Sequence, residues 1–89
     1  MTPGNLKGKV ALVTGAARRI GAQIVRTLHE NGANVAIHYR GSEEAAAALA
    51  AELNKTRRKS AMTIRADLGD TFGLQSVIDD VVAWQGRLD

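Results

Sequence analysis

Three strand candidates alternate along the chain with three stretches of helical spacing. The strand candidates cover residues 9–14, which form a short apolar run, 34–39, and 60–66, where apolar and polar residues alternate somewhat. The helical stretches cover 19–31, the segment from Ser42 to Leu53, and a segment from Asp70 or Thr71 to the closing "QGRLD". Short continuous apolar runs are typical of strands buried on both faces of a parallel sheet. The pattern predicts an α/β fold of the Rossmann type, β-α-β-α-β-α, with right-handed crossovers.

Each helical stretch carries an apolar stripe and signals for its ends. Asn31-Gly32 predicts the end of the first helix, because glycine adopts the left-handed conformation at little cost. Ser42 is a candidate N-cap for the second, followed by two glutamates in the first turn, where negative charge is favoured. The stripes consist of Ile20, Ile24, Val25 and Leu28; Ala46, Leu49, Ala50 and Leu53; and Leu74, Val77, Ile78, Val81 and Val82.

The chain has 89 residues, enough for one small domain. Three parallel strands with three helices make about half of a doubly wound sheet, in which the first strand lies centrally. One edge of that strand would then be bare. The closing "GRLD" resembles the entry to a fourth strand. We therefore expect residues 1–89 to be the N-terminal part of a single dinucleotide-binding domain, truncated after the third helix.

Composition removes several classes of protein and site. Apolar residues make up 45% and charged residues 24%, which is ordinary for a globular domain. The absence of cysteine excludes disulfides and thiolate metal sites. The N-terminus "MTPGNLKGKV" lacks the apolar region of a secretory signal, and no apolar run approaches the roughly 18 residues of a membrane span. We expect a cytoplasmic protein without a membrane partner.

The net charge of +3 is concentrated in Arg18–Arg19 and in Arg57–Lys59. We interpret the second cluster as a solvated helix end or loop. A nucleic-acid partner is not expected, because aromatic residues amount to only 3% and no stacking platform is apparent.

The segment "VTGAARRIGAQI", residues 13–24, joins the first strand to the first helix. Gly15 permits a sharp turn out of the strand, and small Ala16 and Ala17 let the backbone approach a ligand. Gly21 lets the helix pack close to the sheet. Free N–H groups at the start of the helix favour a pyrophosphate, and a second strand follows at the required distance. A turn without a ligand is the alternative. No Gly-Lys-Ser/Thr follows, which excludes a Walker loop.

The end of the second strand bears on the choice of cofactor. NAD-binding units usually place Asp or Glu there to hold the ribose 2′-hydroxyl. Here the sequence is "HYRGS", residues 38–42, with no carboxylate before Glu43. Arg40 can pair with a phosphate, Gly41 and Ser42 can donate to it, and Arg18 could reach the same group. These residues predict NADPH or NADP rather than NAD, the alternative being a solvated Arg40.

The end of the third strand and the second strand offer further candidate residues. "RADL" follows the third strand, where Asp67 can accept from an adenine amino group and the Leu68 backbone can assist. The alternative for Asp67 is a cap of the next turn. His38 is interpreted as an ordinary strand residue facing a helix, with no sign of a ligand or a base.

"GKVALVTGAARRIG", "ADL" and "GRLD" resemble the short-chain dehydrogenase/reductase family over residues 9–89. Arg19 stands where the usual Thr-Gly-x-x-x-Gly-x-Gly loop has its middle glycine. That departure, and "HYRGS", are similar to the bacterial-type pteridine reductases. The resemblance implies that Arg19 contacts the cofactor phosphates and points toward the pterin. The cofactor contacts that it implies are Gly15, Arg19, Ile20, Tyr39, Arg40, Gly41, Ser42, Asp67 and Leu68.

The resemblance also implies an NADPH-dependent reductase that transfers hydride to a pterin or dihydropterin, commonly as a homotetramer. The family's Asn-Asn-Ala segment and Tyr-x-x-x-Lys pair are not in this sequence; Tyr39 has Glu43 four residues later. We therefore assign no catalytic or metal-binding residue and expect the chain alone to be inactive. The alternatives are a non-catalytic NADP-binding or scaffold module, and a reductase of another carbonyl substrate.

Overall fold

The computed structural model describes residues 6–15, 19–41, 43–66, 71–86, 88 and 89. Three strands alternate with three helices in chain order, as the sequence predicts. The elements are β1 (Val10–Val13), α1 (Arg19–Glu30), β2 (Asn34–Tyr39), α2 (Glu43–Thr56), β3 (Ala61–Arg65) and α3 (Thr71–Gln85). The expected boundaries agree within a residue or so, except that α2 continues beyond Leu53 to Thr56.

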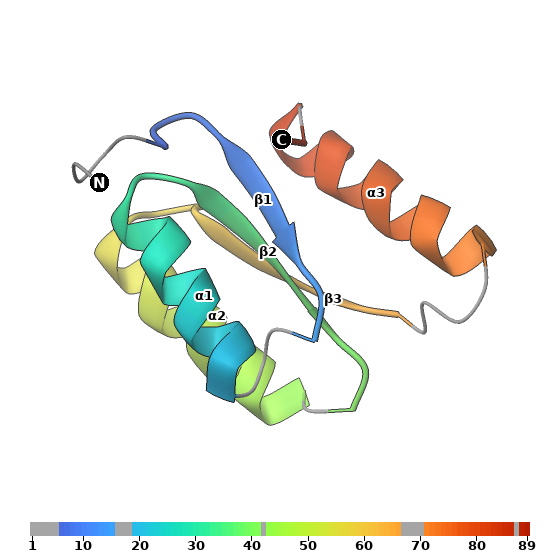
Figure 1. The fold of residues 1–89 in the computed structure, drawn as a ribbon, viewed down its shortest axis with the longest axis horizontal. Helices are drawn as coiled ribbons and strands as arrows, with labels where there is room; N and C mark the ends of the chain where they lie inside the picture. The colour runs from blue at the N-terminus through green and yellow to red at the C-terminus, as the bar shows by residue number, and fades with distance from the viewer. Residues whose placement is uncertain (1–5, 16–18, 42, 67–70, 87) are drawn as a thin grey trace.

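The strands form one parallel sheet in the order β1-β2-β3, with β2 at the centre (Figure 1). Val10 lies opposite Asn34 on β2, and Val35 lies opposite Ala61 on β3. Because all three strands run the same way, their carboxyl ends meet at one edge of the molecule and their amino ends at the other. Each end therefore gathers loops that are far apart in the sequence.

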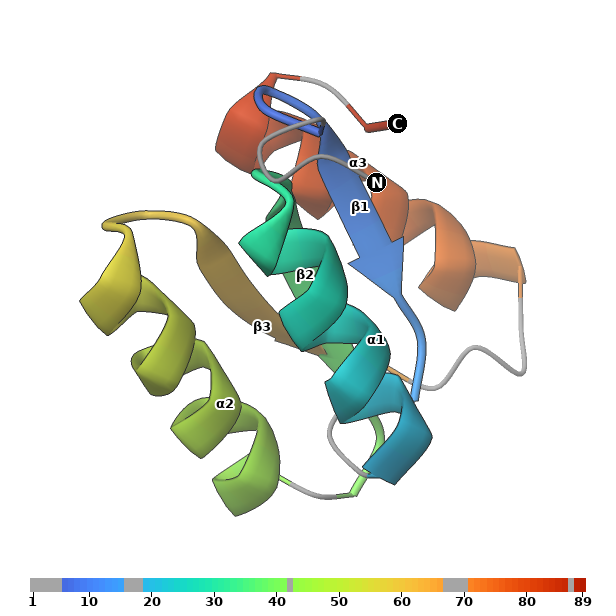
Figure 2. The same ribbon diagram turned by 60° about the vertical axis from the view of Figure 1, so that its left-hand side comes forward.

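The helices cover both faces of the sheet. Helices α1 and α2 lie side by side on one face, and α3 lies on the other (Figures 1 and 2). Successive residues of a strand point to opposite faces, so Val35, Ile37 and Tyr39 pack toward α1 and α2, whereas Ala36 packs with Val77 and Val81 of α3. The sheet is thus buried on both sides, which explains the continuous apolar runs.

The apolar stripe of α2 is confirmed residue by residue. Its four buried positions are Ala46, Leu49, Ala50 and Leu53. The α3 stripe is confirmed at Val77 and Val81, which are buried. Val82 is 40% exposed, and the side chain of Leu74 lies outside the described part of the chain.

The stripe expected on α1 is wrong at two positions. The buried residues are Ala22, Val25 and His29, whereas Ile20 is 78% exposed and Ile24 is 46% exposed. The helix exists where expected but is rotated so that these isoleucines face outward. With Thr27 and Leu28, they line a shallow apolar groove.

The basic cluster at 57–59 differs in part from the solvated loop that the sequence suggested. Arg58 and Lys59 are exposed. Arg57 is only partly exposed, and its guanidinium donates to the carbonyls of His29 (3.1 Å) and Ala33 (2.5 Å). It therefore closes the end of α1, because the last carbonyls of a helix lack partners within it.

The end of α1 also requires a glycine. Gly32 has φ +102°, and a Cβ there would lie 2.8 Å from the backbone nitrogen of Lys7. The lead-in segment crosses at this point, where the Leu6 N–H donates to the Asn31 carbonyl. This confirms Asn31-Gly32 as the helix stop.

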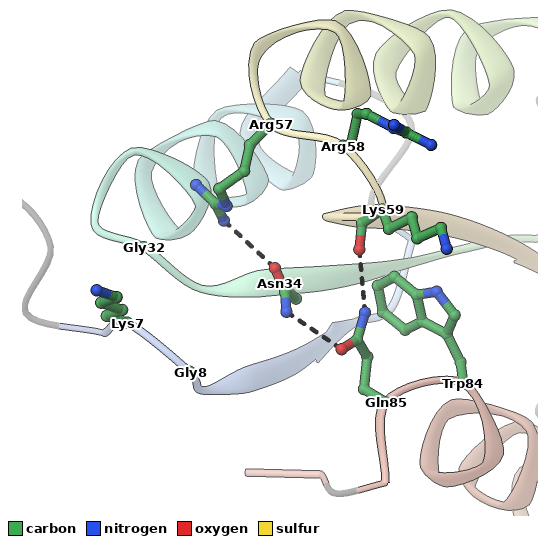
Figure 3. A pocket seen from close by; sticks show the side chains of 9 residues that line it. All are labelled: Lys7, Gly8, Gly32, Asn34, Arg57, Arg58, Lys59, Trp84 and Gln85. Carbon is green, nitrogen blue, oxygen red and sulfur yellow. Dashed lines mark hydrogen bonds between the residues drawn. The ribbon is translucent and has the colours of Figure 1, made fainter.

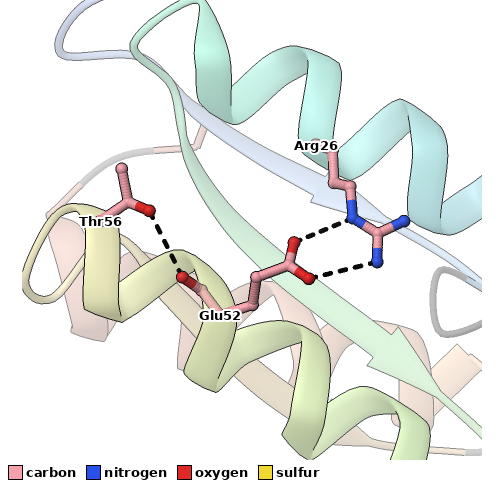
Figure 4. Close-up of polar contacts among 3 residues, drawn as sticks. All are labelled: Arg26, Glu52 and Thr56. Atoms are coloured by element: carbon pink, nitrogen blue, oxygen red, sulfur yellow. Dashed lines mark hydrogen bonds and ion pairs between the residues drawn. The ribbon is translucent and has the colours of Figure 1, made fainter.

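An ion pair joins the two helices of one face. Arg26 on α1 donates through Nε to Glu52 Oε2 at 2.9 Å, and the Thr56 hydroxyl contacts the Glu52 carbonyl at 3.5 Å (Figure 4). The hydrogen bond from Arg26 lowers the pKa of the Glu52 carboxyl. Both side chains are about half exposed, so the pair contributes little to stability.

The outer edge of β1 is paired at its first residue. The Asp89 N–H donates to the Val10 carbonyl at 2.8 Å, and the Val10 N–H donates to Asp89 Oδ2 at 2.9 Å. Asp89, the last residue of the "GRLD" segment that resembles a strand entry, therefore lies beside the first residue of β1. No helix among the described residues is long and apolar enough to cross a membrane.

Candidate nucleotide-binding site

The candidate site lies at the carboxyl ends of the strands, where β1 turns into α1. Gly15 follows β1 with φ +61°, and, its chain neighbours aside, no atom of the described residues lies within 4 Å of the place where its Cβ would stand. The conformation favours glycine, and the open space leaves the backbone accessible to a ligand. The first turn of α1 contains no acidic residue, so the positive end of the helix dipole is not cancelled there. Both features fit an anion.

Arg19 begins α1 with φ +40°, a region that residues other than glycine rarely adopt. The side chain is exposed. The backbone thus keeps the kind of conformation that a glycine would adopt freely, while the residue adds a cation. Arg19 satisfies both the geometry of a glycine loop and the charge requirement of a phosphate site.

The end of β2 supplies the second group of expected residues. Arg40 and Gly41 are exposed, and, its chain neighbours aside, no atom of the described residues lies within 4 Å of the place where a Cβ of Gly41 would stand. Tyr39 is 8% exposed and belongs to the core beneath α1 and α2. Its side chain therefore serves packing, and its backbone is the part that remains for a cofactor. Ile20 is exposed at the start of α1.

His38 is a residue of this site whose role the sequence did not reveal. It is 6% exposed; its Nδ1 accepts a hydrogen bond from the Gly15 N–H at 3.2 Å, and its Nε2 lies 2.7 Å from the Ala66 carbonyl. Because a carbonyl only accepts, Nε2 is the donor of this second bond. His38 is thus more than an ordinary strand residue: it joins the ends of β1, β2 and β3 beneath the loop.

The remaining expected contacts are Arg18, Ser42, Asp67 and Leu68, and they lie outside the described residues. Their assignment to the cofactor stays a prediction. Among the described residues, no group of three or more histidine, cysteine, aspartate or glutamate side chains could hold a metal ion.

The described residues fit a phosphate-bearing cofactor. They combine an open glycine turn, the dipole of α1, and exposed arginines at the ends of two loops. They can bind and orient such a group through backbone N–H donors and guanidinium charge. What the loop offers is recognition rather than proton transfer.

Comparison with known proteins agrees with this geometry. Residues 9–89 match the family model described as short chain dehydrogenase. Versicolorin reductase of Emericella nidulans is 44% identical over 84 residues, which is 94% of this chain and 31% of the relative. A 3-oxoacyl-(acyl-carrier-protein) reductase of Staphylococcus aureus is 42% identical over 81 residues, 91% of this chain and 32% of the relative.

Pteridine reductase 1 of Leishmania tarentolae is 51% identical over 61 residues, which is 68% of this chain and 21% of the relative. The chain spans about a third of the length of the first two relatives and less of this one. The parallel β-α-β-α-β-α arrangement and the match over residues 9–89 lead to one conclusion: the chain belongs to the short-chain dehydrogenase/reductase family, whose members are oxidoreductases that use nicotinamide cofactors.

Proposed function

We propose that these residues form the cofactor-binding part of an NADPH-dependent reductase. The observation that carries the proposal is the pairing of the glycine turn at Gly15 with an exposed arginine at the end of β2. Arg40 stands where NAD-binding units usually have an acidic residue, and the first carboxylate after it is Glu43 in α2. A guanidinium there matches the ribose 2′-phosphate, which NADPH has and NADH lacks.

We further propose a pterin or dihydropterin as the substrate, reduced by hydride transfer. Arg19 in the loop and the 51% identity to a pteridine reductase support this choice. A different carbonyl substrate is the second candidate, because the versicolorin and 3-oxoacyl reductases match more of this chain, 94% and 91% against 68%. Turnover of NADPH with a dihydropterin, with versicolorin and with a 3-oxoacyl thioester separates the two candidates.

The residues for proton transfer would come from sequence that follows Asp89 in the full protein. A Tyr-x-x-x-Lys segment encoded there would support the enzyme over a non-catalytic NADP-binding module. A reading frame that stops at Asp89 would favour the module.

The cofactor assignment is tested by Arg40→Ala in the full protein. Loss of a charge-assisted contact of about 1.5–3 kcal/mol should weaken NADPH roughly ten- to hundredfold and leave NADH nearly unchanged. Dissociation constants for both cofactors, from titration of nicotinamide fluorescence, give the comparison. Lys55→Ala is the matched control, since Lys55 is an exposed cation in the last turn of α2. Equal losses for both cofactors would remove the 2′-phosphate from the proposal.

A further inference from the structure

A second basic site lies at the opposite end of the sheet from the nucleotide loop. It is an open cleft of about 750 Å³ at the amino ends of the strands (Figure 3). Four separate segments meet there: the lead-in to β1, the start of β2, the turn before β3 and the end of α3. The lining residues are Lys7, Gly8, Gly32, Asn34, Arg57, Arg58, Lys59, Trp84 and Gln85.

The cleft carries an excess of positive charge. Of the nine described residues that line it, four are cations and none is acidic. Among the residues that the structure describes, the ion pair found is Arg26–Glu52, and it involves none of these cations. The nearby carboxylate of Asp89 accepts from the Val10 N–H, and Glu30 is exposed at the end of α1. The cations of the cleft therefore lack a paired carboxylate in the described chain.

One of these cations is held in a fixed position. The Arg57 guanidinium donates to the carbonyls of His29 and Ala33 and lies 3.5 Å from Asn34 Oδ1. Neutral carbonyl and amide oxygens satisfy its hydrogen bonds but leave its charge uncompensated. A long side chain fixed in this way loses little further freedom when an anion binds.

A chain of amide hydrogen bonds continues this framework across the cleft. Asn34 Nδ2 donates to Gln85 Oε1 at 3.3 Å, and Gln85 Nε2 donates to the Lys59 carbonyl at 3.0 Å (Figure 3). Lys59 itself is held at φ +57°, a left-handed conformation. The end of α3 is thereby tied to the turn that carries the exposed cations Arg58 and Lys59.

We propose that this cleft binds a polyphosphate group, meaning two or more linked phosphates, at a site separate from the nucleotide loop. Lys7 and Arg57 extend toward one side of the cleft, and Arg58 and Lys59 extend toward the other (Figure 3). An anion whose charge is spread over linked phosphates suits this arrangement better than a single phosphate, whereas a nucleic-acid duplex requires a row of cations along a surface. The volume lies within the range of small-molecule sites. Trp84 in the wall offers an apolar surface for a ring attached to the phosphates.

The test is calorimetric titration of the full protein with inorganic tripolyphosphate at low salt. The wild type should bind, and Arg58→Gln/Lys59→Gln should bind about tenfold more weakly, because two of the four described cations that line the cleft are lost. Lys55→Gln, which removes an exposed cation outside the cleft, should change the affinity by less than about twofold. An equal loss in this control would overturn the proposal, as would wild-type protein that takes up no tripolyphosphate.

Two further arms separate the sources of a signal. The nucleotide loop can itself take up phosphate, so the titration is repeated with that loop saturated by NADPH, where tripolyphosphate binding at the cleft should persist. Binding that disappears there, with full binding in Arg58→Gln/Lys59→Gln, assigns the signal to the loop and overturns the proposal. Quenching of tryptophan fluorescence by tripolyphosphate that occurs in the wild type and disappears in Trp84→Phe places the ligand in the cleft. Quenching that persists in Trp84→Phe, or tight binding of duplex DNA without tripolyphosphate binding, contradicts it.

Discussion

Among single residues, Arg19 combines a glycine-like backbone conformation with a cationic side chain. Its φ of +40° is the conformation of a loop glycine, yet its side chain is an exposed cation at the start of α1. Such backbone costs of order 1–2 kcal/mol in a residue with a Cβ. Strain of this kind persists where the surroundings enforce it, and it is concentrated at functional sites.

Arg19→Gly and Arg19→Ala separate these two features. Glycine adopts the positive φ without strain but removes the cation, whereas alanine removes the cation and keeps the backbone strain. If the charge matters, both variants lose NADPH affinity about equally, by roughly tenfold for one charged hydrogen bond. Cofactor titration gives the affinities, and urea unfolding should differ by only about 1 kcal/mol between the variants. Full NADPH affinity in Arg19→Gly would leave Arg19 with a purely backbone role.

At the scale of elements, His38 links the ends of all three strands. Replacing it with leucine leaves the Gly15 N–H without its acceptor and the Ala66 carbonyl without its donor. We expect His38→Leu to lower the free energy of unfolding by about 2–4 kcal/mol in urea denaturation, at about 1–2 kcal/mol for each bond lost. Cofactor affinity should fall with it, because the turn at Gly15 loses its anchor. His38→Gln can both donate and accept, and it should therefore recover part of each loss. A His38→Leu variant that unfolds at the same urea concentration as the wild type would contradict this role of His38.

A second histidine joins α1 to the turn before β3. His29 is 3% exposed, and its Nε2 lies 2.6 Å from the Ser60 hydroxyl. That hydroxyl lies 2.5 Å from the Arg57 carbonyl. Since Ser60 has one hydroxyl proton, donation to that carbonyl leaves its oxygen to accept from His29. The pKa of His29 is lowered, first by burial and then by the positive charge of Arg57, against a smaller opposing effect of Glu30.

This lowered pKa fixes the direction of a pH effect. In the unfolded chain His29 takes up its proton near pH 6.5, whereas the folded protein resists protonation until lower pH. Stability is therefore complete above about pH 6.5 and falls as the pH drops through the folded value, by at most about 1.4 kcal/mol per pH unit. Urea unfolding at several pH values measures the slope, and His29→Gln should flatten it. A slope that His29→Gln leaves unchanged would assign the effect to another group.

The helices and strands, but not the rotation of α1 about its axis, could be predicted from the sequence. The periodicity of apolar residues located each helix and strand, because each element must present an apolar face to its neighbours. The stripe of α2 was correct, whereas Ile20 and Ile24 of α1 face outward. Spacing identifies an amphipathic helix but leaves open which side of it a neighbour covers.

The candidate site likewise contains residues that could be predicted from the sequence and residues that could not. Gly15 and Arg40 follow from local pattern, since each stands directly after a strand. His38 could not be assigned, because its partners are 23 and 28 residues away in the sequence. Arg57 was missed as an anchor of α1 for the same reason, its carbonyl partners lying 28 and 24 residues earlier. Contacts of this kind exist only once the strands are in register.

At the scale of the whole molecule, β2 is paired on both edges and β1 on one. The alternation of backbone groups turns the N–H of Ala11 toward β2 and that of Leu12 away from it. Among the described residues, pairing on the outer edge of β1 is found at Val10, with Asp89. Stability against local opening should therefore decrease from the centre of the sheet to this edge.

Amide hydrogen exchange followed by NMR should show this gradient. In the 89-residue chain, the amides of Val35 and Ile37 should exchange slowest, because both are bonded within the sheet and fully buried. The Leu12 amide should exchange far faster, although it lies in a strand. Asp89→Ala should then speed exchange at Val10, whose N–H donates to that carboxylate, without affecting Ile37. Slow exchange at Leu12 would mean that the outer edge is covered, and exchange at Ile37 as fast as at Leu12 would contradict a sheet centred on β2.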